Sequence, residues 1–235
     1  MKLHHFFYAA ARDLFNLLFP DLCCACGCLL YRAEKAVCTF CLYDLPYTDH
    51  HLYADNKTAR KLWGRIPFHA AMAFLHFRKA GPVQELIHQL KYRNRQDLGL
   101  LLGRMLGERL LEAPLYHGLD CILPVPLHRK KEKLRGYNQS LCIAKGIAEV
   151  LGIPVLEKDL IRNTATSSQT QKSRYKRYEN MKDVFEVKQE AQLLGLHVLL
   201  VDDVITTGAT IEACAIVLQQ AGISRLSIAT LAFAD

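Results

Sequence analysis

The residues best suited to chemistry lie in the segment LHVLLVDDVITTGAT, which spans Leu196–Thr210. Its apolar run, Val198–Val201, has the length and the branching of a buried parallel strand. Two adjacent carboxylates, Asp202 and Asp203, follow that run, and a helical pattern begins a few residues later over Ile211–Gln220. A carboxylate pair at the end of a buried strand can accept hydrogen bonds from the hydroxyls of a sugar.

The loop between this carboxylate pair and the helix carries hydroxyl groups and a glycine. Its residues are Thr206, Thr207, Gly208, Ala209 and Thr210. Amides exposed at a helix start, the helix dipole and the threonine hydroxyls together favour a bound phosphate. Gly208 lets the backbone approach that phosphate closely, because it has no side chain. We therefore expect a sugar-phosphate site here.

The ordered string of these residues resembles the phosphoribosyl pyrophosphate (PRPP) signature of type I phosphoribosyltransferases. That signature has apolar residues, two acids, two aliphatic residues, Thr, Thr or Ser, Gly, a small residue and Thr. The plain alternative is an ordinary strand–loop–helix turn with an aspartate near the N-cap. The resemblance implies a catalytic carboxylate pair with Mg²⁺ nearby, in a PRPP site made of Val201, Asp202, Asp203, Thr206, Thr207, Gly208, Ala209 and Thr210.

Cysteines are concentrated near the N-terminus, where six of the nine lie between Cys23 and Cys41. Two Cys-x-x-Cys pairs are separated by eleven residues, and each pair presents two thiolates to one metal ion. Cys24 and Cys28 leave the register of the first pair open. Because the segment has few apolar residues, we expect the ion to supply its folding energy. The pairs predict a closed, structural Zn²⁺ site with the ligands Cys23, Cys26, Cys38 and Cys41.

The other cysteines and the nearby histidines have plainer interpretations. His50 and His51 are candidate ligands, although exposed loop histidines are the commoner case. Clustered cysteines bind metal rather than pair in a reducing cytosol, so we expect a cytoplasmic protein. The pattern over Phe6–Leu18 favours a helix packed on the protein, and no stretch reaches the ~18 apolar residues of a membrane span. Three further cysteines are expected in the core: Cys121, Cys142 and Cys214.

The formal net charge of +7 is concentrated in two segments. His128–Arg135 carries five Lys or Arg against one Glu, and Arg162–Lys182 carries six against one Glu, which leaves the rest of the chain at −2. The plain alternative is a solvated basic surface. Local positive charge of this size favours an anionic ligand, which is pyrophosphate, a nucleotide or nucleic acid.

Strand and helix patterns alternate through the middle of the chain. Ala70–Phe77 predicts a strand, and Val83–Tyr92 and Leu98–Leu111 predict helices. Asp120–Pro126 predicts a short strand that its prolines end, before a basic loop and the helix Leu141–Leu151. The alternation predicts an α/β fold with a parallel sheet flanked by helices, whose ligands gather at the carboxyl ends of the strands.

Taken in order along nearly the whole chain, the motifs resemble the ComF family, a competence-associated group of phosphoribosyltransferase-like proteins. This resemblance implies a type I phosphoribosyltransferase-like domain with a small N-terminal four-cysteine zinc-finger module. It also implies a link to the uptake of single-stranded DNA during natural transformation. The motifs are the cysteine pairs after Leu18-Phe19-Pro20, then Leu90-Lys91-Tyr92, Pro124-Val125-Pro126-Leu127-His128, Arg135-Gly136-Tyr137-Asn138-Gln139, Gln169–Asn180 and the PRPP signature.

The same resemblance implies roles for the two basic segments. The loop after Val125-Pro126 corresponds to the pyrophosphate loop, with Arg129 or Arg135 as its guanidinium. Arg162–Asn180 corresponds to a flexible lid, whose candidate cations are Lys172, Arg174 and Arg177. The implied domains are a cysteine module over residues 1–60 and a transferase-like domain over residues 61–235. A hood at about residues 61–112 would choose the acceptor.

Three functions remain open from the sequence. The first is transfer of a phosphoribosyl group from PRPP to an unknown acceptor, in support of DNA uptake. The second is a non-catalytic factor that keeps the PRPP site and binds single-stranded DNA, with the DNA-uptake machinery as its partner. Its basic loops and aromatics such as Tyr137, Tyr175 and Tyr178 would track the strand by charge and stacking. The third is a regulator that senses the sugar phosphate.

Overall fold

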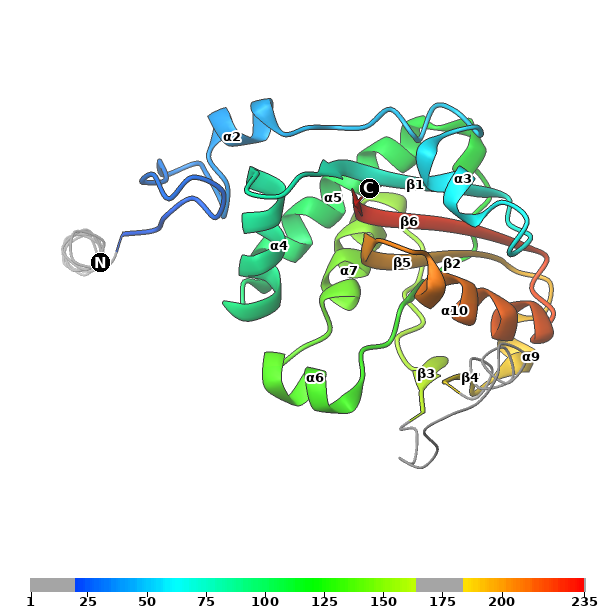
Figure 1. The fold of residues 1–235 in the computed structure, drawn as a ribbon. Helices are drawn as coiled ribbons and strands as arrows, with labels where there is room; N and C mark the ends of the chain where they lie inside the picture. The colour runs from blue at the N-terminus through cyan, green and yellow to red at the C-terminus, as the bar shows by residue number, and fades with distance from the viewer. Residues whose placement is uncertain (1–19, 164–183, 235) are drawn as a thin grey trace, which may run out of the picture.

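A four-stranded parallel sheet forms the centre of the fold (Figure 1). The computed structural model describes residues 20–163 and 184–234. The strand order is β1-β6-β5-β2, so the last two strands of the sequence lie in the middle of the sheet. The bounds are β1 Ala70–Phe77, β2 Cys121–Pro124, β5 His197–Ile205 and β6 Arg225–Ala234, with a separate antiparallel pair, β3 Leu160–Arg162 and β4 Phe185–Val187.

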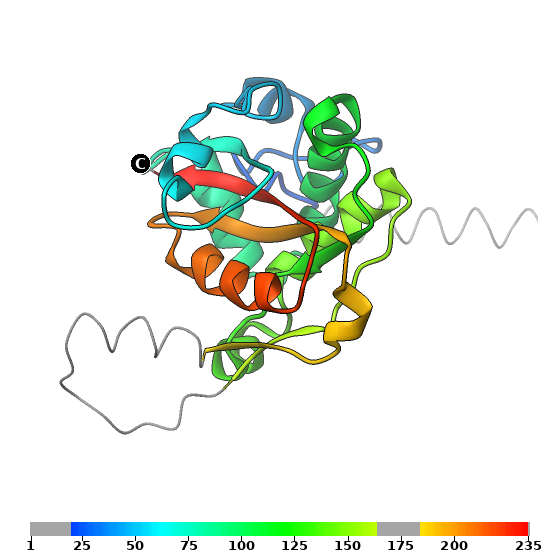
Figure 2. The ribbon, with the colours of Figure 1, turned by 90° about the vertical axis from the view of Figure 1, so that its right-hand side faces the viewer.

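Helices cover both faces of the sheet (Figures 1 and 2). One face packs against α4 Pro82–Tyr92, α5 Gln96–Glu112 and α7 Gln139–Leu151. The other face packs against α3 Lys57–Leu62 and α10 Ala209–Gln220. The remaining short elements are α2 Thr39–Asp44 in the cysteine segment, η1 Pro114–Tyr116, α6 Arg129–Arg135 and α9 Glu190–Leu193.

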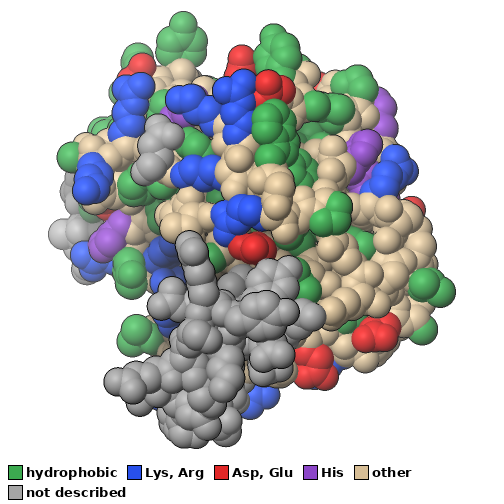
Figure 3. All heavy atoms as spheres, turned by 45° about the vertical axis from the view of Figure 1, so that its right-hand side comes forward, with side chains coloured by type: hydrophobic (Ala, Val, Ile, Leu, Met, Phe, Trp, Pro, Cys, Tyr) green, Lys and Arg blue, Asp and Glu red, His purple; other side chains and the backbone are tan. Residues whose placement is uncertain are grey.

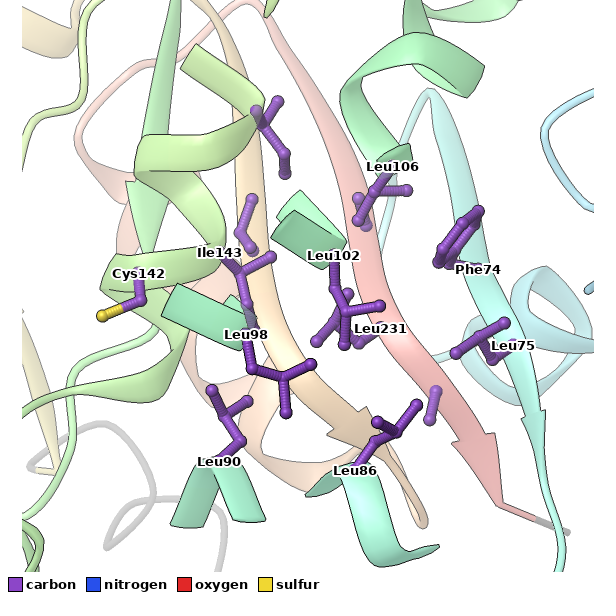
Figure 4. Packing of buried hydrophobic residues seen from close by; sticks show 14 of the residues in the cluster. Phe74, Leu75, Leu86, Leu90, Leu98, Leu102, Leu106, Cys142, Ile143 and Leu231 are labelled. Atoms are coloured by element: carbon purple, nitrogen blue, oxygen red, sulfur yellow. The ribbon is translucent and has the colours of Figure 1, made fainter. Parts of the chain in front are cut away.

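The alternation of side chains along the central strands produces two hydrophobic cores. Leu199 and Val201 face the core with α4, α5 and α7, whereas Val198 and Leu200 face the core with α10. Successive side chains of a strand point to opposite faces, so one apolar run serves both. Figure 4 shows the first core, where side chains from β1, β6, α4, α5 and α7 meet: Phe74, Leu231, Leu90, Leu102 and Ile143.

The predicted alternation of strands and helices is confirmed, and with it the α/β parallel sheet. One difference is the length of β5, which continues past Val201 because its ladder with β6 continues through Asp202 opposite Thr230 and Ile205 opposite Phe233. The carboxylate pair therefore belongs to the strand itself. Its backbone is fixed by sheet hydrogen bonds rather than by a loop.

A second difference is the basic segment His128–Arg135, which was predicted to be a loop and is largely helix α6. The side chain of His128 accepts a hydrogen bond from the Lys130 amide at 3.2 Å and so caps the helix. Gly136 ends it with a left-handed φ of 81°. No residue of α6 is buried, so the helix has no apolar stripe by which the sequence could have revealed it.

Several predictions fall outside the described residues. These include the helical pattern over Phe6–Leu18 and the lid cations Lys172, Arg174 and Arg177. The division into residues 1–60 and 61–235 stays a prediction, and its boundary falls within α3. Of the helices within residues 20–163 and 184–234, none has both the length and the apolar character that a membrane span requires.

Helices α5 and α7 approach each other closely because glycines line their contact. A Cβ added at Gly146 would lie 2.9 Å from the Arg104 amide nitrogen and 2.9 Å from Gly103 Cα, and it would press on the Leu100 carbonyl. All of these are backbone atoms, which cannot move without shifting a helix. The contact matters for the site because it fixes α7, whose first turn contacts the Asp202 carboxylate of β5.

We predict that Gly146→Ala lowers the free energy of unfolding by about 1–3 kcal/mol, as overpacking does. Alanine has the higher helix propensity by about 0.5–1 kcal/mol, so a stabilised variant would contradict this account of the contact. The measurement is chemical denaturation. Glu108→Ala, at an exposed position of α5, is the matched control and should change stability little.

Candidate functional site

The two carboxylates of β5 lie near the carboxyl end of the sheet and contact different helices. Asp202 Oδ1 accepts hydrogen bonds from Ser140 Oγ at 3.0 Å and from the Asp203 amide at 2.8 Å. Ser140 is in the first turn of α7, and the Asn138 side chain caps that turn by accepting the Ser140 amide. The side chain of Asp203 meets α4 instead, where Lys91 Nζ lies 2.8 Å from Asp203 Oδ2. Each carboxylate thus has its own partner helix.

Lys91 is a site residue to which the sequence analysis assigned no role. It forms its ion pair in a shielded place, since only 21% of its side chain and 14% of that of Asp203 are exposed. An ion pair with so little solvent exposure is only weakly screened by salt, and losing one partner leaves an uncompensated charge. The only sequence feature that pointed to Lys91 was its position in the Leu90-Lys91-Tyr92 motif. Local sequence could not show that its partner lies on β5.

The electrostatics of the pair favour a cation. Burial, and after it the charge of Asp203, raises the pKa of Asp202 to about 7. Hydrogen bonds from Ser140 and the Asp203 amide, and the charge of Lys91, act in the opposite direction without cancelling the shift. When both carboxylates are ionised, one ammonium neutralises only one of them. Two adjacent carboxylates with a surplus negative charge are a donor set that fits Mg²⁺.

The loop of residues 206–210 follows β5 and is open to solvent. Thr206, Thr207, Ala209 and Thr210 are exposed, whereas Gly208 is buried. Gly208 is the N-cap of α10 with a φ of 78°, a left-handed conformation that glycine adopts without strain. The Ala209 amide donates to Thr207 Oγ1 at 3.4 Å, which brings a hydroxyl to the helix start. This arrangement of hydroxyls and helix N-terminus suits a phosphate.

The structure adds another reason for glycine at position 208 to the one that the sequence suggested. A Cβ on Gly208 would lie 2.9 Å from Leu62 Cδ2 and 3.1 Å from Arg65 Nη1. The crowded side of this glycine is therefore the side that faces α3 and the turn after it. Gly208 permits close packing of the loop on α3, in addition to its left-handed φ.

The structure places the two arginine candidates differently. Arg135 Nη1 donates to Gln139 Oε1 at 2.7 Å, and its guanidinium lies 5.5 Å from the centroid of the Tyr92 ring. Gln139 adjoins Ser140 and Tyr92 adjoins Lys91, so Arg135 lies near the partners of both carboxylates. Arg129 is exposed and lines a cavity of about 320 Å³ with Asn138 and Arg162. Arg135 is thus the better placed of the two.

Tyr137 does not offer a stacking surface for single-stranded DNA, contrary to the expectation from sequence. Only 8% of it is exposed, and its hydroxyl donates to the Leu90 carbonyl. The tyrosine instead ties the loop before α7 to the end of α4. The other two tyrosines of that prediction, Tyr175 and Tyr178, lie outside the described residues.

His50 and His51 are buried rather than exposed in a loop, with 5% and 6% of their surface accessible. His50 Nδ1 lies 3.0 Å from Thr58 Oγ1, and the ring packs edge-on against His76 and Phe233. Burial lowers the pKa of His50 to about 4, so it is neutral at physiological pH. Its surroundings are those of a structural residue of the core edge.

Thiols near the N-terminus gather in one place. The sulfur atoms of Cys23, Cys26, Cys28 and Cys38 all lie within 4.8 Å of one another. Three of these belong to the predicted ligand set. Its fourth member, Cys41, interacts through its thiol with Cys26, Cys38 and Cys23. The cluster is compatible with a zinc-finger module, and Cys28 and Cys41 compete for the fourth position. Outside the cluster, three cysteines are buried as predicted: Cys121, Cys142 and Cys214.

Comparison with known proteins defines the class of this domain. Residues 138–235 match the family model described as phosphoribosyl transferase domain. That range begins at the N-cap of α7 and contains both carboxylates and the 206–210 loop. The chain therefore carries a phosphoribosyltransferase-like domain, with the parallel sheet and flanking helices as its fold.

Three relatives define the family. DNA utilization protein YhgH of Escherichia coli (strain K12) is 31% identical over 200 residues, which is 84% of each chain. A protein of the same name from Salmonella typhi is 34% identical over 150 residues, and the match covers 63% of this chain and 65% of that relative. Competence protein F of Haemophilus influenzae is 28% identical over 91% of this chain and 97% of its own. The chain belongs to the ComF family.

The solved structures to which the chain shows some similarity include two transferases. The glutamine PRPP amidotransferase of B. subtilis, complexed with ADP and GMP, has 22% identity and a TM-score of 0.44, over 61% of this chain and 30% of its own. The adenine phosphoribosyltransferase of Saccharomyces cerevisiae has 21% identity and a TM-score of 0.33, over 67% of this chain and 71% of its own.

The raised pKa of Asp202 predicts a cost in stability. Below about pH 4 its carboxyl is protonated in both the folded and the unfolded chain. Between about pH 4 and pH 7 the folded chain keeps a proton that the unfolded chain has lost, so the free energy of unfolding falls as pH rises. Asp202→Asn is neutral, and its amide oxygen can still accept from Ser140. We expect this variant to be more stable than the parent at about pH 8, by about 1–2 kcal/mol.

Thermal melts between about pH 5 and pH 8 measure this effect. Asp203→Asn is the matched control, and it should show no such gain because it leaves Lys91 without its carboxylate. An Asp202→Asn variant that melts at or below the parent at about pH 8 would show that the Asp202 carboxyl carries no electrostatic cost.

Proposed function

We propose that this protein binds PRPP with Mg²⁺ and transfers its phosphoribosyl group to an acceptor. The observation that carries the proposal is the continuity of two adjacent carboxylates near the end of β5 with an open loop at the start of α10. Asp202 and Asp203 would accept hydrogen bonds from the ribose hydroxyls. The exposed hydroxyls of Thr206, Thr207 and Thr210 and the amides around Gly208 would hold the 5′-phosphate.

The proposed reaction is a displacement at the anomeric carbon of the ribose. The bond from that carbon to pyrophosphate breaks, and a bond from the acceptor forms. No protein nucleophile is needed, so the residues act by orientation, by charge stabilisation and by exclusion of water. Bound Mg²⁺ would neutralise charge on the pyrophosphate. Arg135 is the proposed guanidinium for the leaving group, with Arg129 as the alternative and Lys172, Arg174 and Arg177 as proposed lid cations.

The names of the relatives suggest where this chemistry is used. They are called DNA utilization protein and Competence protein F, and we propose a role for this chain in DNA uptake or use, in the cytoplasm. A second candidate function is a single-stranded-DNA-binding factor without turnover. It is favoured by α6, which presents exposed Lys130, Lys131 and Lys133 to solvent. The loss of Tyr137 as a stacking surface weakens it, because non-specific strand binding combines charge with aromatic stacking.

Calorimetry with PRPP and Mg²⁺ tests the first function. Asp202→Ala and Asp203→Ala should each weaken binding by about 10- to 150-fold, because each removes hydrogen bonds to a charged group that are worth about 1.5–3 kcal/mol. Binding by the parent should strengthen as pH rises through about 7, since Asp202 accepts from hydroxyls and metal only when ionised.

Glu149→Ala is the matched control, since this exposed acid lies near the far end of α7 and pairs with Arg104. If the double alanine variant at positions 202 and 203 binds PRPP as tightly as the parent, the site lies elsewhere. Binding of single-stranded oligonucleotides that falls steeply with salt, with no heat from PRPP, would favour the second function.

We also propose a structural zinc ion in the cysteine module. Cys23 Sγ accepts hydrogen bonds from the amides of Ala25 at 3.4 Å and Cys38 at 3.3 Å, contacts that stabilise a thiolate. Cys26 Sγ lies 3.2 Å from Cys28 Sγ and 3.8 Å from Cys38 Sγ. Sulfurs this close to one another suit a common tetrahedral ion, and with four protein ligands no position is left for catalysis.

Elemental analysis should find one zinc per chain. Cys41→Ser should lose the metal and lower the melting temperature, whereas Cys28→Ser should keep it, because spacing pairs Cys38 with Cys41 in one knuckle. The opposite result would exchange Cys41 for Cys28 in the ligand set. Cys24→Ser is the control and should retain zinc. Freshly purified protein without zinc would refute the site.

A further inference from the structure

The 206–210 loop is held from outside by a segment far away in the sequence. Lys61, in the last turn of α3, donates from Nζ to the Thr206 carbonyl at 2.8 Å. The same ammonium donates to the carbonyl of Ala234 at the end of β6 and lies 4.2 Å from the centroid of the Phe233 ring. One side chain thus ties the loop to the neighbouring strand.

Arg65, just after α3, makes a second set of contacts to the same loop. Its Nη1 donates to the Thr207 carbonyl and, at 3.1 Å, to the Lys61 carbonyl. Its Nε donates at 3.1 Å to Glu212 Oε2, in the first turn of α10. Figure 3 looks onto the face with α3 and α10, and blue Lys and Arg side chains lie there beside red carboxylates. We call Lys61 and Arg65 the α3 clamp.

The clamp determines which way the loop amides point. A trans peptide holds its carbonyl and its N–H in nearly opposite directions. With the Thr206 and Thr207 carbonyls directed at the clamp, the amides of Thr207 and Gly208 point away from α3, to the open side of the loop. A Cβ added at Gly208 would lie 2.9 Å from Leu62 Cδ2, which shows how closely the loop packs on α3.

Helix α3 is itself anchored to the sheet, so the clamp has a rigid base. The Asn56 side chain caps α3 by accepting the Ala59 amide at 3.0 Å. Its amide group donates to the Ala71 carbonyl on β1 at 2.8 Å, and Asn56 is 7% exposed. Ala59 and Leu62 are fully buried against the sheet. Movement of the helix backbone that carries Lys61 would therefore require α3 to leave β1.

We propose that Lys61 and Arg65 are positioning residues that direct the Thr207 and Gly208 amides at the 5′-phosphate of the ligand. This inference rests on the proposed PRPP site and adds to it residues that touch the loop and not the phosphate. The two cations also lie behind the loop, where their charge favours an anion on its other side.

The test compares Arg65→Ala, Arg65→Lys and Arg60→Ala. Arg60 is the matched control because it lies on α3, is 61% exposed and pairs only with Asp55 among the contacts described. The first measurement needs no ligand: ¹⁵N relaxation of the Gly208 amide should show faster motion in Arg65→Ala and no change in Arg60→Ala. The second is calorimetry with ribose 5-phosphate and with PRPP and Mg²⁺.

We expect Arg65→Ala to bind ribose 5-phosphate about tenfold more weakly. A loss of this size corresponds to the loss of the charge-assisted hydrogen bonds that Arg65 makes. Arg65→Lys should recover part of the affinity, because an ammonium can reach the Thr207 carbonyl without bridging to Glu212. A purely structural role would not give this graded rescue at equal melting temperature.

Two outcomes overturn the clamp: a Gly208 amide that is equally rigid in Arg65→Ala, or a looser amide with unchanged affinity for ribose 5-phosphate. Failure of the parent itself to bind either ligand would overturn the proposed function, and the phosphate role of the clamp with it. The relaxation data distinguish this case, because they report on the loop whether or not a ligand binds.

Discussion

The structure depends on one electrostatic constraint: two half-buried carboxylates stand side by side near the end of a central strand. Sheet pairing with β6 fixes the backbone of this segment, so Asp202 and Asp203 are held next to each other. The cost appears as the raised pKa of Asp202. Two neighbouring groups reduce this cost: the Ser140 hydroxyl of α7 donates to Asp202, and the Lys91 ammonium of α4 pairs with Asp203. A site with surplus negative charge, held in place, suits the cation and the sugar hydroxyls that we propose as its ligands.

Much of the rest of the fold serves to bring distant segments to this point. Glycines at the contact of α5 and α7 let α7 lie close, which places Ser140 at the carboxylate. The Tyr137 hydroxyl bonds the end of α4, and so joins the helices that carry the partners of both carboxylates. On the other face, α3 packs on β1 and meets the 206–210 loop. Helices on both faces of the sheet therefore contribute to one candidate site near the carboxyl end of β5.

The cysteine module shares the main core. Cys23, Val37 and Leu45 belong to the same hydrophobic cluster as Phe74 and Leu75 of β1. The chain after the module also runs beside β1, where the Thr48 amide donates to the Phe74 carbonyl at 2.9 Å and covers the edge of the sheet. The cysteine module therefore packs on β1, and β1 in turn anchors α3 and the 206–210 loop that α3 contacts.

The sequence by itself determined the order of strands and helices, the parallel sheet, and the carboxylates and loop on β5 and α10. These follow from periodicity and from a contiguous motif, which are local properties. Helix α6 escaped prediction because nothing in it is buried. Only the tertiary structure brought Lys91 to Asp203, set Lys61 and Arg65 behind the loop, and buried Tyr137 and His50. Such contacts join residues far apart in the chain, and no local pattern records which partner a lysine, an arginine or a tyrosine will meet after packing.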